Sequence, residues 1–251
     1  MLFPTGSRVQ ATRAYTLVFV GLFLMPSVGI DHAVAAKSSG SKSSAPAKPS
    51  QPKSPTAAGQ ATLDQAKRLI DSEQPEAAAT ILRQFIESNP PAELLDDAYL
   101  LMAAAMFGMR EYSESTRYLN QLMGEFPSSE LIDRTKLLLA KTHAKAGNLD
   151  LALPLLAEVK SLTTDANTKR EALRLTGEFQ VQKKDYPRAI QAWLEEMNAE
   201  PDDQPREAEA RIRDLVNETL DKPALLRVRD AYPKSFPGDL ASIKLIELAA
   251  G

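Results

Sequence analysis

The sequence predicts an all-α protein, an α-solenoid of helical hairpins that follow one another along the chain. A pattern of small, large and helix-breaking residues occurs four times with a period of 37 residues, and such a period is typical of repeat architectures. Apolar residues make up 43% of the chain and aromatic residues only 6%. Packing must therefore rely on Leu, Ala, Ile and Met, which is a helical composition.

Each unit is predicted to contain two helices that approach closely. A marker residue recurs at Pro75, Tyr112, Leu149 and Tyr186. Nine residues before each marker stands a small residue: Ala66, Ala103, Ala140 and Gly177. Three residues after each marker stands a second small residue: Ala78, Ser115, Ala152 and Ala189. Four residues further on stands a large one: Leu82, Leu119, Leu156 and Trp193. Small residues let two helix backbones approach, while the large residue fills the space beside them.

Turn and stop signals separate these helices. Gly147-Asn148 and Lys184-Asp185 directly precede two of the markers and are typical of helix ends. Proline disfavours helix in the residue before it, and the units close at Pro90, Pro127, Thr164 and Pro201. The order is therefore helix, turn, helix and stop.

These residues resemble the tetratricopeptide family, whose units carry small residues at the same two places, an aromatic before the second helix and a proline at the end. The resemblance covers residues 61–204 and lies in spacing more than identity, because the tryptophan and glycine of the family's first helix are mostly replaced. The segment Glu125–Asp133 resembles linkers of bacterial envelope members of the family, of the outer-membrane assembly lipoprotein and cell-division coordinator type. Tyr232–Ala241 is similar to the amino-terminal tetratricopeptide region of penicillin-binding-protein activators.

The pattern weakens after Asp203. Helices are expected at 206–220 and 223–232, but the 37-residue register places Asp230 where a large packing residue belongs. A last amphipathic helix, 239–251, has two interpretations. It caps the solenoid, or the chain is the front part of a longer protein.

The amino terminus is predicted to direct export. Arg8 and Arg13 precede an apolar run from Tyr15 to Met25, and Ala33–Ala36 offers a signal-peptidase site. This pattern favours cleavage over retention as an anchor and predicts a periplasmic protein. Because the chain has no cysteine, a lipid anchor and disulfides are not expected. The predicted division is a signal peptide (1–36), a disordered linker (37–60), tetratricopeptide-like repeats (61–204) and a degenerate repeat with capping helices (205–251).

The linker is basic and the body is acidic. Residues 37–60 contain four lysines and no acid, whereas residues 61–251 hold 24 Lys or Arg against 32 Asp or Glu. The lysines either contact an anionic surface weakly or only keep the linker soluble, and their wide spacing favours the second interpretation. The acidic body makes nucleic acid an unexpected partner.

The residues favour no catalysis, cofactor or metal. The body contains one histidine, His143, whose expected role is packing. Glu195-Glu196 and Asp202-Asp203 are interpreted as solvated or helix-capping acids, because neighbouring helix residues point in different directions. Trp193 is expected in the core, since it shares its place in the repeat with leucines.

A protein-binding groove is the remaining candidate site. In solenoids of helical hairpins the first helices line a groove, and tetratricopeptide geometry places six candidate residues there: Lys67, Phe107, Arg134, Lys141, Lys145 and Arg174. The cations predict a positive strip for an acidic peptide, although charged helix faces are more often only solvated. The family's carboxylate-binding asparagines are missing. The predicted function is a periplasmic adaptor for extended or helical segments of envelope proteins, in cell-wall synthesis or outer-membrane assembly; the alternative is a structural spacer or self-associating module.

Overall fold

The computed structural model describes residues 55–199 and 206–250, and every regular element in these ranges is helical. The predicted signal peptide, most of the predicted linker and Asp202-Asp203 lie outside the described residues. The first four hairpins comprise α1 (Pro55–Asp71), α2 (Pro75–Glu87), α3 (Leu95–Gly108), α4 (Tyr112–Glu125), α5 (Ile132–Lys145), α6 (Leu149–Leu162), α7 (Ala166–Gln182) and α8 (Tyr186–Ala199), with a short 3₁₀ turn η1 (Ala92–Leu94) before α3. The remaining elements are α9 (Arg206–Asp214), the π-helical segment η2 (Leu215–Thr219), α10 (Lys222–Ala231) and α11 (Phe236–Ala250).

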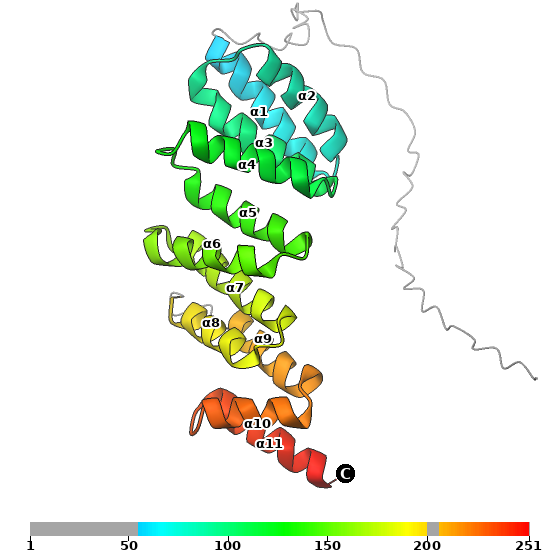
Figure 1. Cartoon of the computed structure of the whole chain (residues 1–251), viewed down its shortest axis with the longest axis vertical. Helices are drawn as coiled ribbons and strands as arrows, with labels where there is room; N and C mark the ends of the chain where they lie inside the picture. Colours follow the sequence, from blue (N-terminus) through cyan, green and yellow to red (C-terminus); the bar gives the residue numbers. More distant parts are fainter. Residues whose placement is uncertain (1–54, 200–205, 251) are drawn as a thin grey trace, which may run out of the picture. The chain divides into compact units, whose positions relative to one another are not determined.

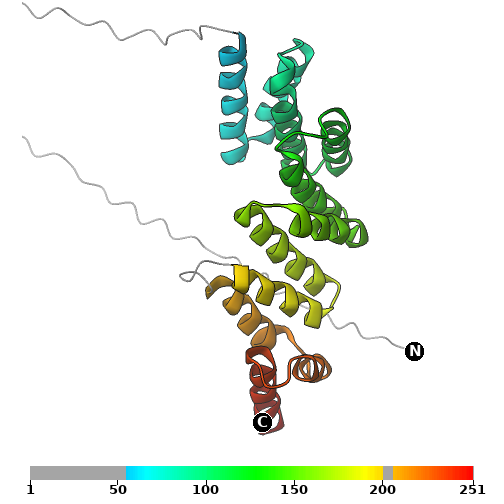
Figure 2. The same ribbon diagram turned by 90° about the vertical axis from the view of Figure 1, so that its left-hand side faces the viewer.

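Helices α1 to α8 form four hairpins in chain order. Each first helix packs on its own second helix, and each second helix packs on the first helix of the next hairpin. Figures 1 and 2 show this succession of paired helices from two directions. The predicted all-α class and its tandem hairpins are therefore confirmed.

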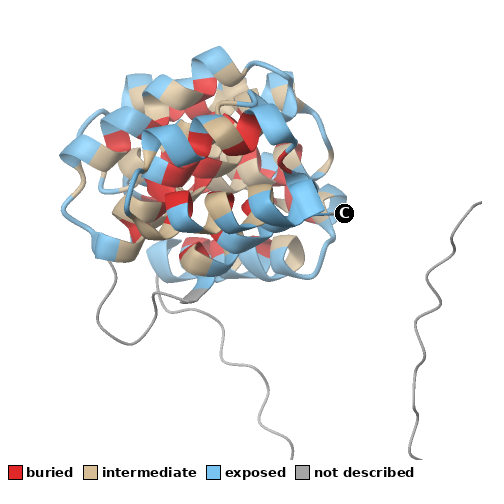
Figure 3. Ribbon diagram, turned by 90° about the horizontal axis from the view of Figure 1, so that it is seen from below, coloured by how far each residue is buried: buried red, intermediate tan, exposed pale blue. Residues whose placement is uncertain are grey.

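The 37-residue pattern coincides with the observed elements. The second helices begin at the four markers, Pro75, Tyr112, Leu149 and Tyr186. All the small and large residues that define the pattern are buried. Figure 3 shows the buried residues on the helix faces that meet inside the array, with exposed residues on the outer faces. The sequence pattern therefore reports the contacts that hold each hairpin together.

The turns inside the four hairpins share one backbone conformation. A residue with positive φ stands two positions before each second helix: Glu73, Arg110, Gly147 and Lys184. The next amide donates to a carbonyl five residues earlier, as in Asn148 N to His143 O at 2.8 Å. This bond satisfies a carbonyl at the end of the first helix. Only one of the four turns has the glycine that favours a positive φ, so the sequence signalled this turn clearly in one unit.

Gly177 shows why the first helix carries a small residue. A methyl group added there would lie 2.2 Å from Nε1 of Trp193, closer than two such atoms can approach. The Trp193 ring lies against α7, and its Nε1 donates to the carbonyl of Arg174 at 3.3 Å. Trp193 is 4% exposed, which confirms its expected place in the core.

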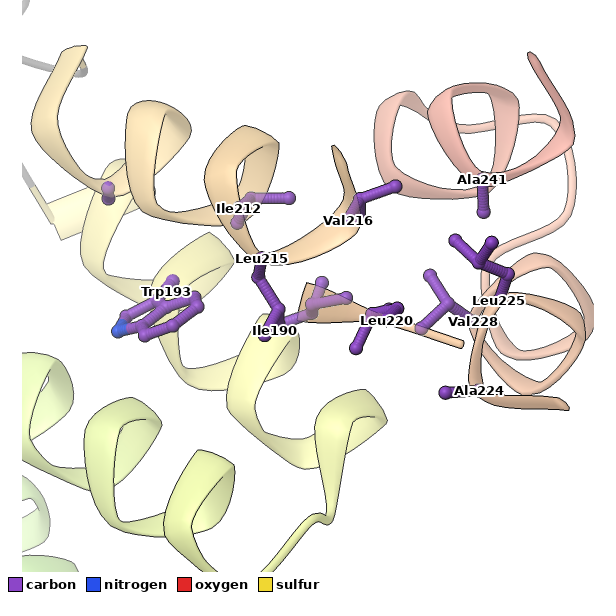
Figure 4. Close-up of a cluster of buried hydrophobic side chains, with 11 residues drawn as sticks. Ile190, Trp193, Ile212, Leu215, Val216, Leu220, Ala224, Leu225, Val228 and Ala241 are labelled. Carbon is purple, nitrogen blue, oxygen red and sulfur yellow. The ribbon is translucent and has the colours of Figure 1, made fainter. Parts of the chain in front are cut away.

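The hairpin order changes after α8. α10 pairs with α11, α9 packs against α8 and α11, and η2 packs against α11. Figure 4 shows Trp193 and Ile190 of α8 beside Ile212 and Leu215. Val216 and Leu220 belong to the same cluster and lie between these residues and the side chains of α10 and α11. Asp230 stands exposed near the end of α10, whose buried residues are Ala224, Leu225 and Val228, so the 37-residue pattern does not continue into this helix.

Both end helices differ in detail from the expectation. α1 begins at Pro55, inside the range assigned to the linker, and Gly59 is buried there against Leu94 and Phe85. α11 does not present a polar outer face. Its side chains Ile243, Ile246 and Leu248 are 56%, 69% and 52% exposed.

Candidate protein-binding groove

The first helices form a continuous lane. α1 contacts α3, α3 contacts α5 and α5 contacts α7, in addition to the contacts of each first helix with its second helices. Residues spaced three and four apart on these helices share one face. A ligand lying across the lane would therefore meet several helices, each with a few side chains.

A cavity of about 290 Å³ opens between α3, α5 and α7. We call it the α5–α7 pocket. Its apolar lining comes from Phe107, Ala144, Leu175 and Phe179, and its polar lining from Lys141, Lys145, Glu178 and Gln182. Three of the six candidate residues, Phe107, Lys141 and Lys145, thus meet in one cavity. Because they come from different hairpins, the stacking of hairpins creates this site.

Glu171 organises the charges beside this pocket. Its carboxylate is 2.8 Å from Nζ of Lys141 and 2.7 Å from Nε of Arg174. Arg174 also pairs with Glu178 one turn further along α7. The hydrogen bond from Arg174 and, in second place, Lys141 outweigh burial and lower the pKa of Glu171 to about 2. The same pairing raises the pKa of Arg174 above its ordinary value.

The candidate cations therefore differ in availability. Lys141 and Arg174 are paired with carboxylates, so they add less positive potential than the sequence alone indicates. Lys145 is exposed at the mouth of the α5–α7 pocket, and the described residues give it no salt-bridge partner. Arg134 is exposed in the first turn of α5, about 16 Å along the helix from Lys145 at 1.5 Å per residue. Lys67 is exposed on α1 and does not line this pocket.

The pairing of these cations with acidic side chains was not predicted from the sequence, although a signal for part of it exists. Glu171, Arg174 and Glu178 stand at i, i+3 and i+7, a spacing that places opposite charges on one helix face. The pairing with Lys141 on α5 is different. It depends on how two hairpins stack, and no local spacing encodes it.

A second cavity of about 320 Å³ is bordered by α7, α8, α9 and η2. We call it the α7–α9 pocket. Its apolar lining is Val181, Trp193 and Leu215, and its polar lining is Glu178, Arg211, Asp214, Glu218 and Thr219. The Trp193 ring reaches this cavity from a second helix because Gly177 leaves room for it. No local spacing in the sequence predicts this pocket, since it depends on where α9 packs.

The α7–α9 pocket has an acidic rim. Arg211 is its one lining cation, and an Arg211 Nη2 to Glu196 Oε1 contact of 2.5 Å pairs it with a carboxylate. The guanidinium carbon of Arg211 lies 5.9 Å from the centre of the Trp193 ring. Asp214 and Glu218 are exposed, and no salt bridge joins either of them to another described residue.

The described residues show few other candidates for chemistry. Within ranges 55–199 and 206–250, no group of three or more His, Asp or Glu side chains is placed to hold a metal ion. No helix in those ranges has the length and apolarity needed to cross a membrane. His143 is half-buried on α5, and burial lowers its pKa.

The fold and the groove define an all-α solenoid of tetratricopeptide-like helical hairpins with two pockets on its first-helix lane. No family model matches the chain, and no curated protein matches it. One similar solved structure is described as MamA RS-1 ArsTM double mutant, with a TM-score of 0.49, 14% identity, and coverage of 76% of this chain and 94% of that chain. Another is described as MamA AMB-1, with a TM-score of 0.45, 16% identity, and coverage of 77% and 92%. Similarity at this level assigns no function.

Proposed function

We propose that this protein is a non-catalytic scaffold that binds extended or helical segments of partner proteins in the lane of its first helices. The observation that carries the proposal is the α5–α7 pocket, in which apolar side chains from three hairpins are combined with the exposed Lys145. Few polar groups around an apolar cavity are typical of a binding site. Peptide recognition by helical proteins uses such pockets for anchor side chains.

The proposed setting is the periplasm, with partners in cell-wall synthesis or outer-membrane assembly. The support is the amino-terminal pattern of Arg8, Arg13, the apolar run and the alanines at 33–36. The partner class rests on the family resemblance of the repeats. Residues 37–60 would then be a linker attached to the acidic body, and their lysines would need no partner of their own.

The test is photo-crosslinking from inside the pocket. A benzophenone amino acid replaces Gln182, an exposed residue of the α5–α7 pocket, in the full chain expressed in its own cells. The same probe at Gln191, exposed on α8, reports background. Mass spectrometry then identifies the captured protein and the crosslinked segment.

Charge reversal at Lys145 shows whether capture depends on the pocket. Lys145 is exposed, so Lys145→Glu should fold normally, whereas reversal at Arg174 would break its pairing with Glu171 and Glu178. Arg83→Glu, on an exposed site of α2, is the matched control. We expect crosslinks from Gln182 to one defined segment, reduced by Lys145→Glu and unchanged by Arg83→Glu. Equal crosslinking from Gln182 and Gln191, or no effect of Lys145→Glu, would refute groove binding.

Self-association is a second candidate function because α11 exposes Ile243 and Ile246, which stand three residues apart and therefore share one helix face. Exposed apolar side chains that gather in one place are typical of interaction surfaces. Ile246→Lys should leave the fold intact, since this side chain is already 69% exposed. If self-association is the function, light scattering of the full chain should show an oligomer that Ile246→Lys converts to a monomer. A monomeric wild-type protein at all concentrations tested would remove this candidate.

A further inference from the structure

The two pockets of the groove both border one helix, α7, and share one residue. Glu178 lines both the α5–α7 pocket and the α7–α9 pocket. Its carboxylate is held by Arg174 from the same helix. The pair therefore forms a nearly neutral divider between two cavities of about 290 and 320 Å³.

The rims of these cavities carry opposite charge. On the α5 side stand Lys141, which is paired with Glu171, and the exposed Lys145. On the α9 side stand the exposed Asp214 and Glu218, while Arg211 is engaged with Glu196. A ligand carboxylate at the α5 rim would lie beside Lys145, and a ligand cation at the α9 rim would lie beside Asp214 and Glu218. Each ligand group would thus be near exposed charges of the opposite sign.

Both cavities have an apolar part to their lining. Phe107, Leu175 and Phe179 line one, and Val181, Trp193 and Leu215 line the other. The Trp193 ring cannot move toward α7 without meeting the helix, because it already fills the space that Gly177 leaves. The exposed Asp214 and Glu218 beside the second lining suit a cationic group, whereas the Trp193 ring is already approached by Arg211, whose guanidinium carbon lies 5.9 Å from the ring centre.

We propose that the groove recognises a segment of bipolar charge, with an apolar residue and an acidic residue over the α5–α7 pocket and an apolar residue with Lys or Arg over the α7–α9 pocket. This inference rests on the proposed function and adds the chemical class of the partner segment. Packed helices lie roughly 10 Å apart, which about three or four residues of extended chain span. A segment bound with its charges exchanged would place like charges at both rims, so the charges fix its direction.

The probe is a phage-displayed library of random 12-residue peptides selected on the immobilised full chain. We expect enriched peptides to carry an acidic and a basic residue separated by a few positions, each beside an apolar residue. The affinity of one enriched peptide is then measured by fluorescence anisotropy. Neutralising either its acid or its base should weaken binding severalfold, because each removes a solvent-exposed ion pair.

A reciprocal charge exchange separates recognition from folding defects. Asp214→Lys with Glu218→Lys should weaken the enriched peptide roughly tenfold, as expected for losing two exposed ion pairs. The variant should regain affinity for a peptide whose basic residue is replaced by Glu. Glu87→Lys with Glu130→Lys changes the net charge equally at exposed sites outside both pockets and should leave the affinity unchanged.

Each outcome has a defined meaning. Rescue by the exchanged peptide supports the α7–α9 pocket as the site for the basic group. If the enriched peptides lose affinity with Lys145→Glu but are indifferent to Asp214→Lys/Glu218→Lys, the bipolar inference is wrong and the proposed function stands. If selection enriches no peptide, or enriches peptides indifferent to both changes, the proposed function is refuted and the inference with it.

Discussion

Glu171→Gln tests whether the ion pairs beside the α5–α7 pocket stabilise the stacking of hairpins. Glu171 on α7 joins Lys141 on α5 to Arg174 on its own helix. Its pKa lies at about 2 against an ordinary value of 4.5. At about 1.36 kcal/mol for each tenfold change in proton affinity, this corresponds to roughly 3 kcal/mol as an upper limit. Glu171 is 30% exposed, so solvent screening reduces the expected loss to about 1–2 kcal/mol.

The pH dependence gives this prediction its sign. A carboxyl whose pKa is lowered by folding stabilises the folded state fully above its ordinary pKa, and this stability is lost as the pH falls toward its folded value. The difference between wild type and Glu171→Gln should therefore be full at pH 7, shrink below about pH 4.5, and approach zero near pH 2.

Urea unfolding followed by Trp193 fluorescence is a suitable assay, because the chain's one tryptophan packs against α7 beside Arg174. Glu87→Gln, at an exposed site of α2, should change the free energy of unfolding by less than about 0.5 kcal/mol. A Glu171→Gln protein as stable as wild type at pH 7 would refute the role of the ion pairs. A loss that stays the same at pH 7 and pH 3 would show that packing, rather than charge, is responsible.

Three further predictions concern the hairpin contacts. Gly177→Ala should lower the free energy of unfolding, measured in urea, by about 1–3 kcal/mol, because the added methyl group would lie 2.2 Å from Trp193 Nε1. Gly124→Ala is the control: a methyl group added there has no neighbouring atom within 4 Å, so this change should raise the free energy of unfolding by up to about 1 kcal/mol. Ser115→Ala should cost about 1 kcal/mol in the same assay through loss of the 2.9 Å bond from Ser115 Oγ to the Ala103 carbonyl, and a gain in stability would contradict this. Burial lowers the pKa of His143, so protonation of this side chain favours the unfolded chain. The urea concentration at the unfolding midpoint should therefore decrease as the pH drops below about 6.5. His143→Gln should remove that part of the pH dependence, and an unchanged pH profile in this variant would contradict the prediction.

Much of the fold was predictable because each repeat contact is local. The marker, the small residue three positions later and the large residue after it all lie on one helix, so burial of that helix fixes their spacing in the sequence. Tyr112, Ser115 and Leu119 illustrate this: the first begins α4 and the other two are buried. Repetition of the same spacing then identified the hairpins without any knowledge of tertiary contacts.

The turns were only partly predictable. A positive φ favours glycine, and Gly147 provides it in one hairpin, but Glu73, Arg110 and Lys184 adopt the same conformation. In those turns the amide bond back to the first helix, such as Gln74 N to Leu69 O at 2.8 Å, helps to offset the strain of the left-handed residue. Side-chain identity was a weak signal there because the hydrogen bond is made by the backbone.

The sequence indicated three of the residues that line the α5–α7 pocket, but not the charges beside them. The resemblance to tetratricopeptide geometry placed Phe107, Lys141 and Lys145 on the first-helix lane, and they line one cavity. Their effective charge depends on Glu171, which stands 30 residues after Lys141 and reaches it only because α7 packs on α5. The second pocket depends even more on packing, since its acidic rim comes from α9 and η2, where the 37-residue pattern has already weakened.

The weakening of the repeat after α8 and the acidic rim are connected. In the regular units the residues that follow a first helix turn back at once into a second helix. Here α9 continues into η2, a π-helical segment that ends at Thr219, and the next helix, α10, pairs with α11. A π-helical turn displaces the side chains around it relative to an α-helix and occurs often at functional sites. Here it carries Leu215 and Glu218 to the cavity beside Trp193. The irregular end of the repeat array thus supplies one wall of the groove, which a fifth regular hairpin would line with a different set of side chains.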